Sequence, residues 1–143
     1  MIDCRNVIKY KETNMATGNR KILIVEDDKF FRDIISKKLQ KENFDVATTS
    51  DGKEAFAYLE SSIPNLIILD LILPGLDGYE ILSILKKDKK TSGIPVIILS
   101  NLGQQEEIDR AKALGVTDFM IKINFTLEEI VARVNQIFKE KYI

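Results

Sequence analysis

Three short stretches of the sequence are almost entirely apolar, and they limit the possible folds more than any other feature. They read KILIV at residues 21–25, NLIIL at 65–69 and IPVIILS at 94–100. Runs of this length that are rich in Ile, Leu and Val are typical of strands buried on both faces of a sheet. Such strands need helices on both sides, so the segments between them decide the fold.

The segments between these strands carry apolar residues at helical spacing. The expected helices cover residues 28–42, a segment capped by Asp51, and residues 78–87, 104–114 and 126–142. Two further runs, FDVATTS at 44–50 and TDFMIK at 117–122, supply the second and fifth strands. This alternation predicts an α/β fold, a flavodoxin-like doubly wound sheet of five parallel strands in the order 2-1-3-4-5, with five helices. The more polar second strand is expected at an edge.

The first twenty residues show neither helical nor strand periodicity. We interpret residues 1–20 as an N-terminal tail and residues 21–143 as one domain. Met15 opens a more usual entry into a domain, so residues 1–14 suit an upstream extension. The chain ends soon after its last predicted helix, and both a stand-alone protein and a part of a longer one stay open.

Composition narrows the classes of function. Lys and Arg number 21 and Asp and Glu 22, so there is no basic excess, and we expect no direct contact with nucleic acid. No apolar run suits a membrane span or signal peptide, and the single cysteine fits a reducing cytoplasm. The sequence has no histidine, which excludes Ser-His catalysis, histidine metal ligands and a phosphohistidine of its own.

Polar side chains gather where the predicted strands end. In chain order they are Glu26, Asp27, Asp28, Asp70, Ser100 and Lys122. Ligands of such sheets bind beyond the carboxyl ends of the strands where the strand order reverses, here between the first and third strands. Acids that converge there would repel one another without a cation, and Mg²⁺ prefers such oxygen ligands. An activated Asp70 could then attack a phosphoryl group that Lys122 attracts, and form an aspartyl phosphate.

Each of these residues also has an ordinary interpretation. Asp28 is better explained as the N-cap of the helix that follows it. Considered alone, Ser100 suits a turn hydroxyl, Lys122 a solvated lysine and Phe119 a core residue. The functional interpretation depends on their meeting at one end of one sheet.

The chain from about residue 20 to 143 resembles the receiver domain of two-component response regulators. The segments ILIVEDD, LIILDLILPGLDGYEIL, PVIILS and GVTDFMIK fall in that family's order and spacing. The resemblance implies a phosphoaspartate signalling switch that receives its phosphoryl group from a sensor histidine kinase or a phosphotransfer protein. It further implies a protein that promotes only its own phosphoryl transfer and autodephosphorylation, and so is not an enzyme in the usual sense.

By this resemblance, Asp70 is the phosphoacceptor. Glu26 and Asp27 match the acidic pair that holds Mg²⁺ together with Asp70 and the backbone carbonyl of Ile72. Because side chains alternate near a strand end, we expect Asp27 to bind the metal directly and Glu26 to bind it through water.

The remaining site residues belong to the switch. Ser100 matches the switch hydroxyl, Phe119 the switch aromatic and Lys122 the lysine that contacts the phosphoryl group, while Pro74 and Gly78 match the loop after the acceptor. The resemblance implies relay through the fourth helix, fifth strand and fifth helix, and a monomer or a phosphorylation-dependent dimer through that face. Phe119 lacks a tyrosine hydroxyl, so we expect an inward bias of its ring even without phosphorylation.

Two positions depart from the family pattern, and two others bear on how fast phosphorylated Asp70 is hydrolysed. Ile123 replaces the usual proline after the lysine, and we expect a trans Lys122–Ile123 bond because a cis bond costs about 2.5–4 kcal/mol before other residues. Asn101 replaces a smaller residue and narrows access to the site. By the same resemblance, Ile72 and Leu102 flank the path of the attacking water, and neither apolar side chain can orient it, so we expect a long-lived phosphoaspartate.

Three rival interpretations are weaker. A haloacid-dehalogenase-type phosphatase needs a second acid two residues after the aspartate, where this chain has Ile72. A flavodoxin needs a hydroxyl- and glycine-rich phosphate loop, whereas VEDDKFF offers acids that would repel a flavin phosphate. A degenerate receiver would usually have lost Asp70, Ser100 or Lys122, all of which are present.

Overall fold

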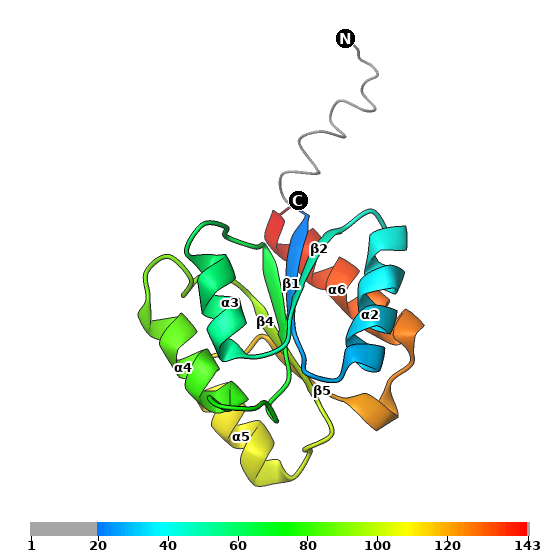
Figure 1. The fold of residues 1–143 in the computed structure, drawn as a ribbon. Helices are drawn as coiled ribbons and strands as arrows, with labels where there is room; N and C mark the ends of the chain where they lie inside the picture. The colour runs from blue at the N-terminus through cyan, green and yellow to red at the C-terminus, as the bar shows by residue number, and fades with distance from the viewer. Residues whose placement is uncertain (1–19, 143) are drawn as a thin grey trace.

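The computed structural model of the protein describes residues 20–142 as a five-stranded parallel sheet between two layers of helices (Figure 1). The strands are β1 (Lys21–Val25), β2 (Asp45–Thr49), β3 (Leu66–Leu69), β4 (Val96–Ser100) and β5 (Asp118–Ile121). The helices are α2 (Lys29–Lys41), α3 (Gly52–Leu59), α4 (Gly78–Lys87), α5 (Gln105–Ala113) and α6 (Leu127–Tyr142), with a short 3-10 helix η1 (Lys122–Asn124). The predicted tail lies outside the described residues, apart from Arg20.

The strand order β2-β1-β3-β4-β5 confirms the predicted topology. The central strands β3 and β4 are buried along their whole length, whereas the edge strands β2 and β5 are partly exposed. Val25 at the end of β1 pairs with Leu69 at the end of β3. This register brings the next residues, Glu26 and Asp70, to the same level at the carboxyl edge of the sheet.

The sheet separates two apolar cores. Leu23 and Val25 face the core beneath α3, α4 and α5, whereas Ile22 and Ile24 face the core beneath α2 and α6. Figure 1 shows these helix layers on opposite sides of the sheet. A shift of β1 by one residue would exchange its two sets of side chains, so the cores fix the register that places the site.

Several helix ends follow the predicted chemistry. Asp28 and Asp51 cap α2 and α3, as expected, and Asp77 caps α4, each by accepting a backbone N–H from the first turn. Gly115 ends α5 with a φ of 92°, a backbone conformation that favours glycine. Arg20 donates to the Glu42 carbonyl at 2.7 Å and therefore belongs with the folded domain.

Gly78 lets α4 approach the end of β3 very closely. A Cβ atom at this position would lie 2.5 Å from the Asp70 carbonyl oxygen and 2.6 Å from the Leu71 Cα. Instead, the Gly78 N–H donates to the Leu71 carbonyl at 2.9 Å. The first turn of α4 is thereby joined directly to the backbone that carries Asp70.

Among residues 20–142, the structure contains no helix that is both long and apolar enough to cross a membrane.

Candidate functional site

Asp70 lies directly beyond β3 with its side chain buried. Its backbone N–H donates to the Val25 carbonyl at 3.1 Å, which extends the sheet by one residue. One carboxylate oxygen accepts from the Ile72 N–H at 3.2 Å, and the other accepts from the Lys122 Nζ at 3.1 Å. Because a buried charge is costly without a partner, the ammonium explains how an acid is tolerated at the end of an apolar strand.

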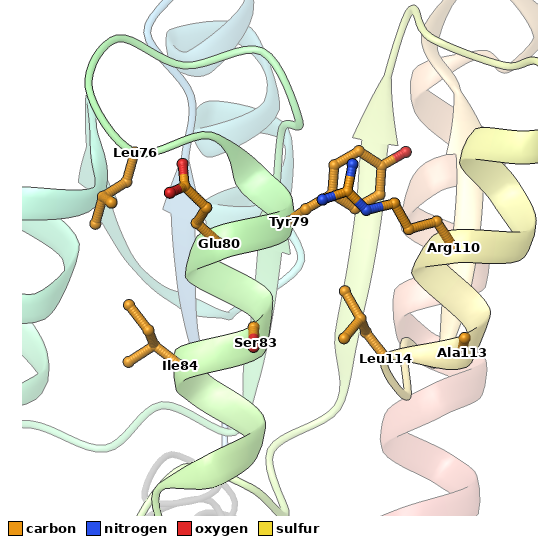
Figure 2. A pocket seen from close by; sticks show the side chains of 8 residues that line it. All are labelled: Leu76, Tyr79, Glu80, Ser83, Ile84, Arg110, Ala113 and Leu114. Atoms are coloured by element: carbon orange, nitrogen blue, oxygen red, sulfur yellow. The ribbon is translucent and has the colours of Figure 1, made fainter.

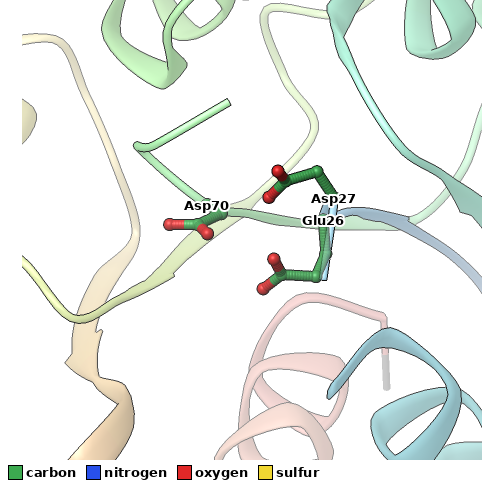
Figure 3. Close-up of side chains that lie close together, drawn as sticks. All are labelled: Glu26, Asp27 and Asp70. Carbon is green, nitrogen blue, oxygen red and sulfur yellow. The ribbon is translucent and has the colours of Figure 1, made fainter. Parts of the chain in front are cut away.

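Two more carboxylates meet Asp70 at the end of β1. Oxygen atoms of Glu26, Asp27 and Asp70 lie within 4.8 Å of one another, and Figure 3 shows the three side chains gathered where β1 and β3 end. Glu26 is 3% exposed, whereas Asp27 is exposed. Three hard oxygen donors in one cluster are a ligand set that suits Mg²⁺.

Asp28 does not join this cluster. Its Oδ1 accepts the Phe31 backbone N–H at 3.2 Å, which confirms the predicted N-cap. The three consecutive acids after β1 therefore divide into two that face the Asp70 carboxylate and one that begins a helix.

Lys122 occupies the centre of the site. It was expected as the last residue of the fifth strand. In the structure β5 ends one residue earlier, at Ile121, and Lys122 begins η1. Its Nζ donates to Glu26 Oε1 at 2.5 Å as well as to Asp70, and lies 4.5 Å from the centre of the Phe31 ring. Lys122 is half-buried between these partners rather than solvated. No peptide bond in the described part of the chain is cis, which confirms the trans prediction before Ile123.

The two charged partners shift each other's proton affinity. Burial raises the pKa of the Glu26 carboxyl to about 6, the Lys122 hydrogen bond opposes this rise, and the charge of Asp70 adds to it. Burial lowers the pKa of Lys122, but the hydrogen bond to Glu26 and the charge of Asp70 outweigh burial, so the net shift is upward. Lys122 is thus held in its charged form between two acids.

Ser100 and Phe119 lie on the other side of Asp70. Ser100 ends β4, is fully buried, and accepts the Leu102 N–H on its Oγ at 3.3 Å. Phe119 in β5 is half-buried and packs against the core beneath α3, α4 and α5. The structure brings the acids and Lys122 together, whereas within residues 20–142 no hydrogen bond joins Ser100 to Asp70.

The arrangement of acids and lysine at the switch point of a 2-1-3-4-5 sheet agrees with the comparisons to known proteins. The response regulator receiver domain matches residues 22–135. The chain belongs to this family. The curated relatives it matches include transcriptional regulators, and the similar solved structures include receiver domains.

Three similar proteins illustrate the match. The Francisella response regulator 1452 receiver domain has a TM-score of 0.77 and 34% identity, over 85% of this chain and 98% of that chain. The phosphorylated cyanobacterial phytochrome response regulator RcpA has a TM-score of 0.73 and 34% identity, over 85% and 92%. The DNA-binding dual master transcriptional regulator RpaA of Synechocystis is 35% identical over 119 residues, which cover 83% of this chain and 49% of RpaA.

This receiver domain spans about half the length of the curated relatives that it matches. One of them is named as DNA-binding, so the expectation of no contact with nucleic acid finds no support in these comparisons.

Two contacts in the receiver domain were missed by sequence reasoning. The Arg32 Nη1 donates to the Glu26 carbonyl at 2.9 Å and fastens the first turn of α2 to the end of β1. Phe31 belongs to the apolar stripe from which the helix at residues 28–42 was predicted, yet its ring lies beside the Lys122 ammonium. The stripe predicts which face of α2 is inward, but not that one ring reaches past the core to the site.

A groove lies elsewhere on the receiver domain, between α4 and α5 (Figure 2). It has a volume of about 510 Å³ and is lined by Leu76, Tyr79, Glu80, Ser83, Ile84, Arg110, Ala113 and Leu114. The Arg110 guanidinium lies 4.0 Å from the centre of the Tyr79 ring, and the Tyr79 hydroxyl donates to the Glu107 carbonyl at 3.0 Å. Its lining is mostly apolar with one carboxylate, so the chemistry expected of a receiver lies at the acid cluster.

Proposed function

We propose that this receiver domain is a phosphoaspartate switch in which Asp70 accepts the phosphoryl group. The observation that carries the proposal is the bonding of its buried carboxylate. One oxygen is held by the Lys122 ammonium and the other by the Ile72 N–H, beside two further acids. Ion pairing with Lys122 alone would account for Asp70 and Glu26, but it would leave the Asp27 carboxylate beside them without a role.

In the proposed reaction, a carboxylate oxygen of Asp70 attacks the phosphorus of a phosphohistidine on another protein. A phosphorus–oxygen bond forms, the phosphorus–nitrogen bond breaks, and the imidazole leaves with the bonding electrons and takes up a proton. Lys122, already 3.1 Å from Asp70, stabilises the added negative charge. The phosphohistidine lies outside the sequence described here, which contains no histidine.

The acid cluster is proposed to hold Mg²⁺ through Glu26, Asp27, Asp70 and the backbone carbonyl of Ile72. The three clustered carboxylates and the burial of Glu26 support this assignment. When bound, the ion supplies positive charge between the carboxylates and the incoming phosphoryl oxygens. Asp27 is proposed as the direct ligand and Glu26 as a ligand through water.

The partner is proposed to be a sensor histidine kinase or a phosphotransfer protein that docks over the site. Phe30 is 76% exposed and Ile123 is 83% exposed. Each is adjacent in sequence to one member of the Phe31–Lys122 contact, so both lie at the margin of the site. Exposed apolar side chains beside a reactive group suit recognition by the apolar surface of another protein.

The output is proposed to pass from Ser100 and Phe119 to the face formed by α5, β5 and α6. The Ser100 hydroxyl accepts the Leu102 N–H at the long distance of 3.3 Å, and Phe119 is half-buried, so neither side chain is tightly held. That face would then change its contacts, either as a monomer or by pairing with a second copy.

Intact mass after incubation with acetyl phosphate and Mg²⁺ tests the central proposal. The unmodified protein should gain one phosphoryl group, and Asp70→Asn should gain none. Asp28→Asn is the matched control, because asparagine caps a helix as well as aspartate and this variant should label normally. Normal labelling of Asp70→Asn would refute the assignment.

A second experiment separates docking from chemistry. Ile123→Glu places a charge on the exposed apolar margin and should slow phosphorylation by the kinase while labelling by acetyl phosphate is unchanged. If the kinase phosphorylates Ile123→Glu as fast as it phosphorylates the unmodified protein, the proposed docking surface is contradicted.

A further inference from the structure

The backbone at Lys122 is held weakly compared with the rest of the site. Lys122 begins the 3-10 helix at the edge of the sheet, and the following residue, Ile123, is 83% exposed. The Lys122 carbonyl accepts the Phe125 N–H at the long distance of 3.5 Å. The position of the ammonium therefore depends on what its side chain meets.

Three partners surround the Lys122 Nζ. Two are the carboxylates of Glu26 and Asp70, and the third is the face of the Phe31 ring at 4.5 Å. An ammonium has three N–H groups, and an aromatic face attracts it without taking an oxygen acceptor. The ring thus fills one side of the ammonium while leaving its hydrogen bonds to the acids.

The Phe31 ring is itself firmly placed. The Phe31 N–H donates to the cap at Asp28, and Arg32 ties the same helical turn to the Glu26 carbonyl. The ring is half-buried and packs against the core beneath α2 and α6. A contact on a rigid element can orient a flexible side chain better than a contact on a loop.

We infer that Phe31 is a positioning residue for phosphorylation, whose ring face holds the Lys122 ammonium beside the Asp70 carboxylate. The inference rests on the proposed role of Lys122 at the phosphoryl group. The carboxylate of Glu26 can change partners during the reaction, whereas the ring offers a neutral contact that stays in place. Phe31 does not touch the phosphoryl group and acts only through Lys122.

The test compares three replacements of Phe31. Phe31→Leu removes the aromatic face, Phe31→Tyr keeps it, and trifluorophenylalanine at the same position keeps the shape but weakens the attraction of the ring face for a cation. Labelling by acetyl phosphate at saturating Mg²⁺ should slow roughly threefold to tenfold for the leucine and fluorinated proteins. Phe31→Tyr should label at nearly the unmodified rate, and Mg²⁺ affinity should be unchanged in all three.

A direct readout of the contact accompanies the rates. Protons next to the Lys122 Nζ lie over the ring, so their nuclear magnetic resonances should move downfield when Phe31→Leu removes the ring current. An unmoved resonance would overturn the inference about Phe31. Because this readout does not need phosphorylation, it distinguishes failure of the Phe31 inference from failure of Asp70 as the acceptor. A fluorinated protein that labels at the unmodified rate would also overturn it, and thermal unfolding excludes loss of the fold.

Discussion

The two sides of the Asp70 site are built differently. The acid side comes from the ends of β1 and β3, where Glu26 and Asp70 are buried and hydrogen-bonded on several atoms. The opposite side comes from β4 and β5, where Ser100 has one long hydrogen bond and Phe119 is only half-buried. The acids are therefore held by more hydrogen bonds than the proposed switch groups, although Ser100 is itself fully buried.

Lys122 spans the two sides. It directly follows the edge strand β5 and reaches the acids that follow β1 and β3. We therefore expect a change in the charge of Asp70 to alter the position of the Lys122 ammonium at the edge of the sheet.

The largest expected effect concerns stability. Ile68→Ala in β3 should lower the free energy of unfolding by about 2–5 kcal/mol, because Ile68 is buried in the core beneath α2 and α6. Ile121→Ala in β5 is the matched change at the edge, where the side chain is half-buried, and should cost about 1 kcal/mol. Urea unfolding measures the loss of stability in both variants. Similar losses would show that β3 and β5 do not differ in how tightly their side chains are packed.

Metal binding should separate two neighbouring acids. Asp27→Ala should weaken Mg²⁺ binding at least about tenfold, because it removes a proposed ligand. Asp28→Ala should change Mg²⁺ affinity little but lower the free energy of unfolding by about 1 kcal/mol, because it removes the cap of α2. Calorimetric titration with Mg²⁺ measures the affinity of both variants. Equal losses of affinity would contradict the assignment of Asp27 to the metal and Asp28 to the cap of α2.

The lifetime of phosphorylated Asp70 should depend on Ile72, which follows β3, and on Leu102, which follows β4. Ile72 is 56% exposed and Leu102 is half-buried, and neither side chain can orient a water molecule. The double variant Ile72→Asn/Leu102→Glu should lose labelled phosphate roughly fivefold faster, a change of about 1 kcal/mol in the barrier. If the unmodified protein decays within seconds, or the variant decays no faster, these side chains do not set the lifetime.

The smallest expected effect is a pH dependence of metal affinity. Burial raises the pKa of Glu26 to about 6, so its ionised fraction is nearly complete at neutral pH and falls as the pH drops through that value. Between about pH 7.5 and 5.5, Mg²⁺ affinity should fall about fourfold, because the protonated carboxyl is a poor ligand.

The variant Glu26→Gln provides the control for this pH dependence. It should bind Mg²⁺ weakly at both pH values, with little dependence on pH in this range. A steep dependence that persists in this variant would place the titrating group elsewhere.

Much of the fold was accessible from the sequence because its apolar patterns are strong. The helix predicted at residues 78–87 agrees with α4, and the strand order follows from which runs are most apolar. The convergence of Glu26, Asp27 and Asp70 also follows from topology, because parallel strands end at one edge.

Other parts of the site could not be predicted from pattern. The ion pair between Lys122 and Glu26 depends on where β5 ends and on the path of a long side chain. The contact of Arg110 with Tyr79 depends on how α4 and α5 pack across the groove. Such contacts between distant residues depend on rotamers and helix positions, which periodicity does not encode.

The close approach at Gly78 couples α4 to the backbone that carries the acceptor. With no space for even one carbon atom between α4 and the Asp70 backbone, that helix and the acceptor act as a single block. We therefore expect any displacement of the Asp70 backbone to carry the first turn of α4 with it. A side chain at position 78 would have to push the two apart, so this glycine sets how closely the helix and the acceptor are coupled.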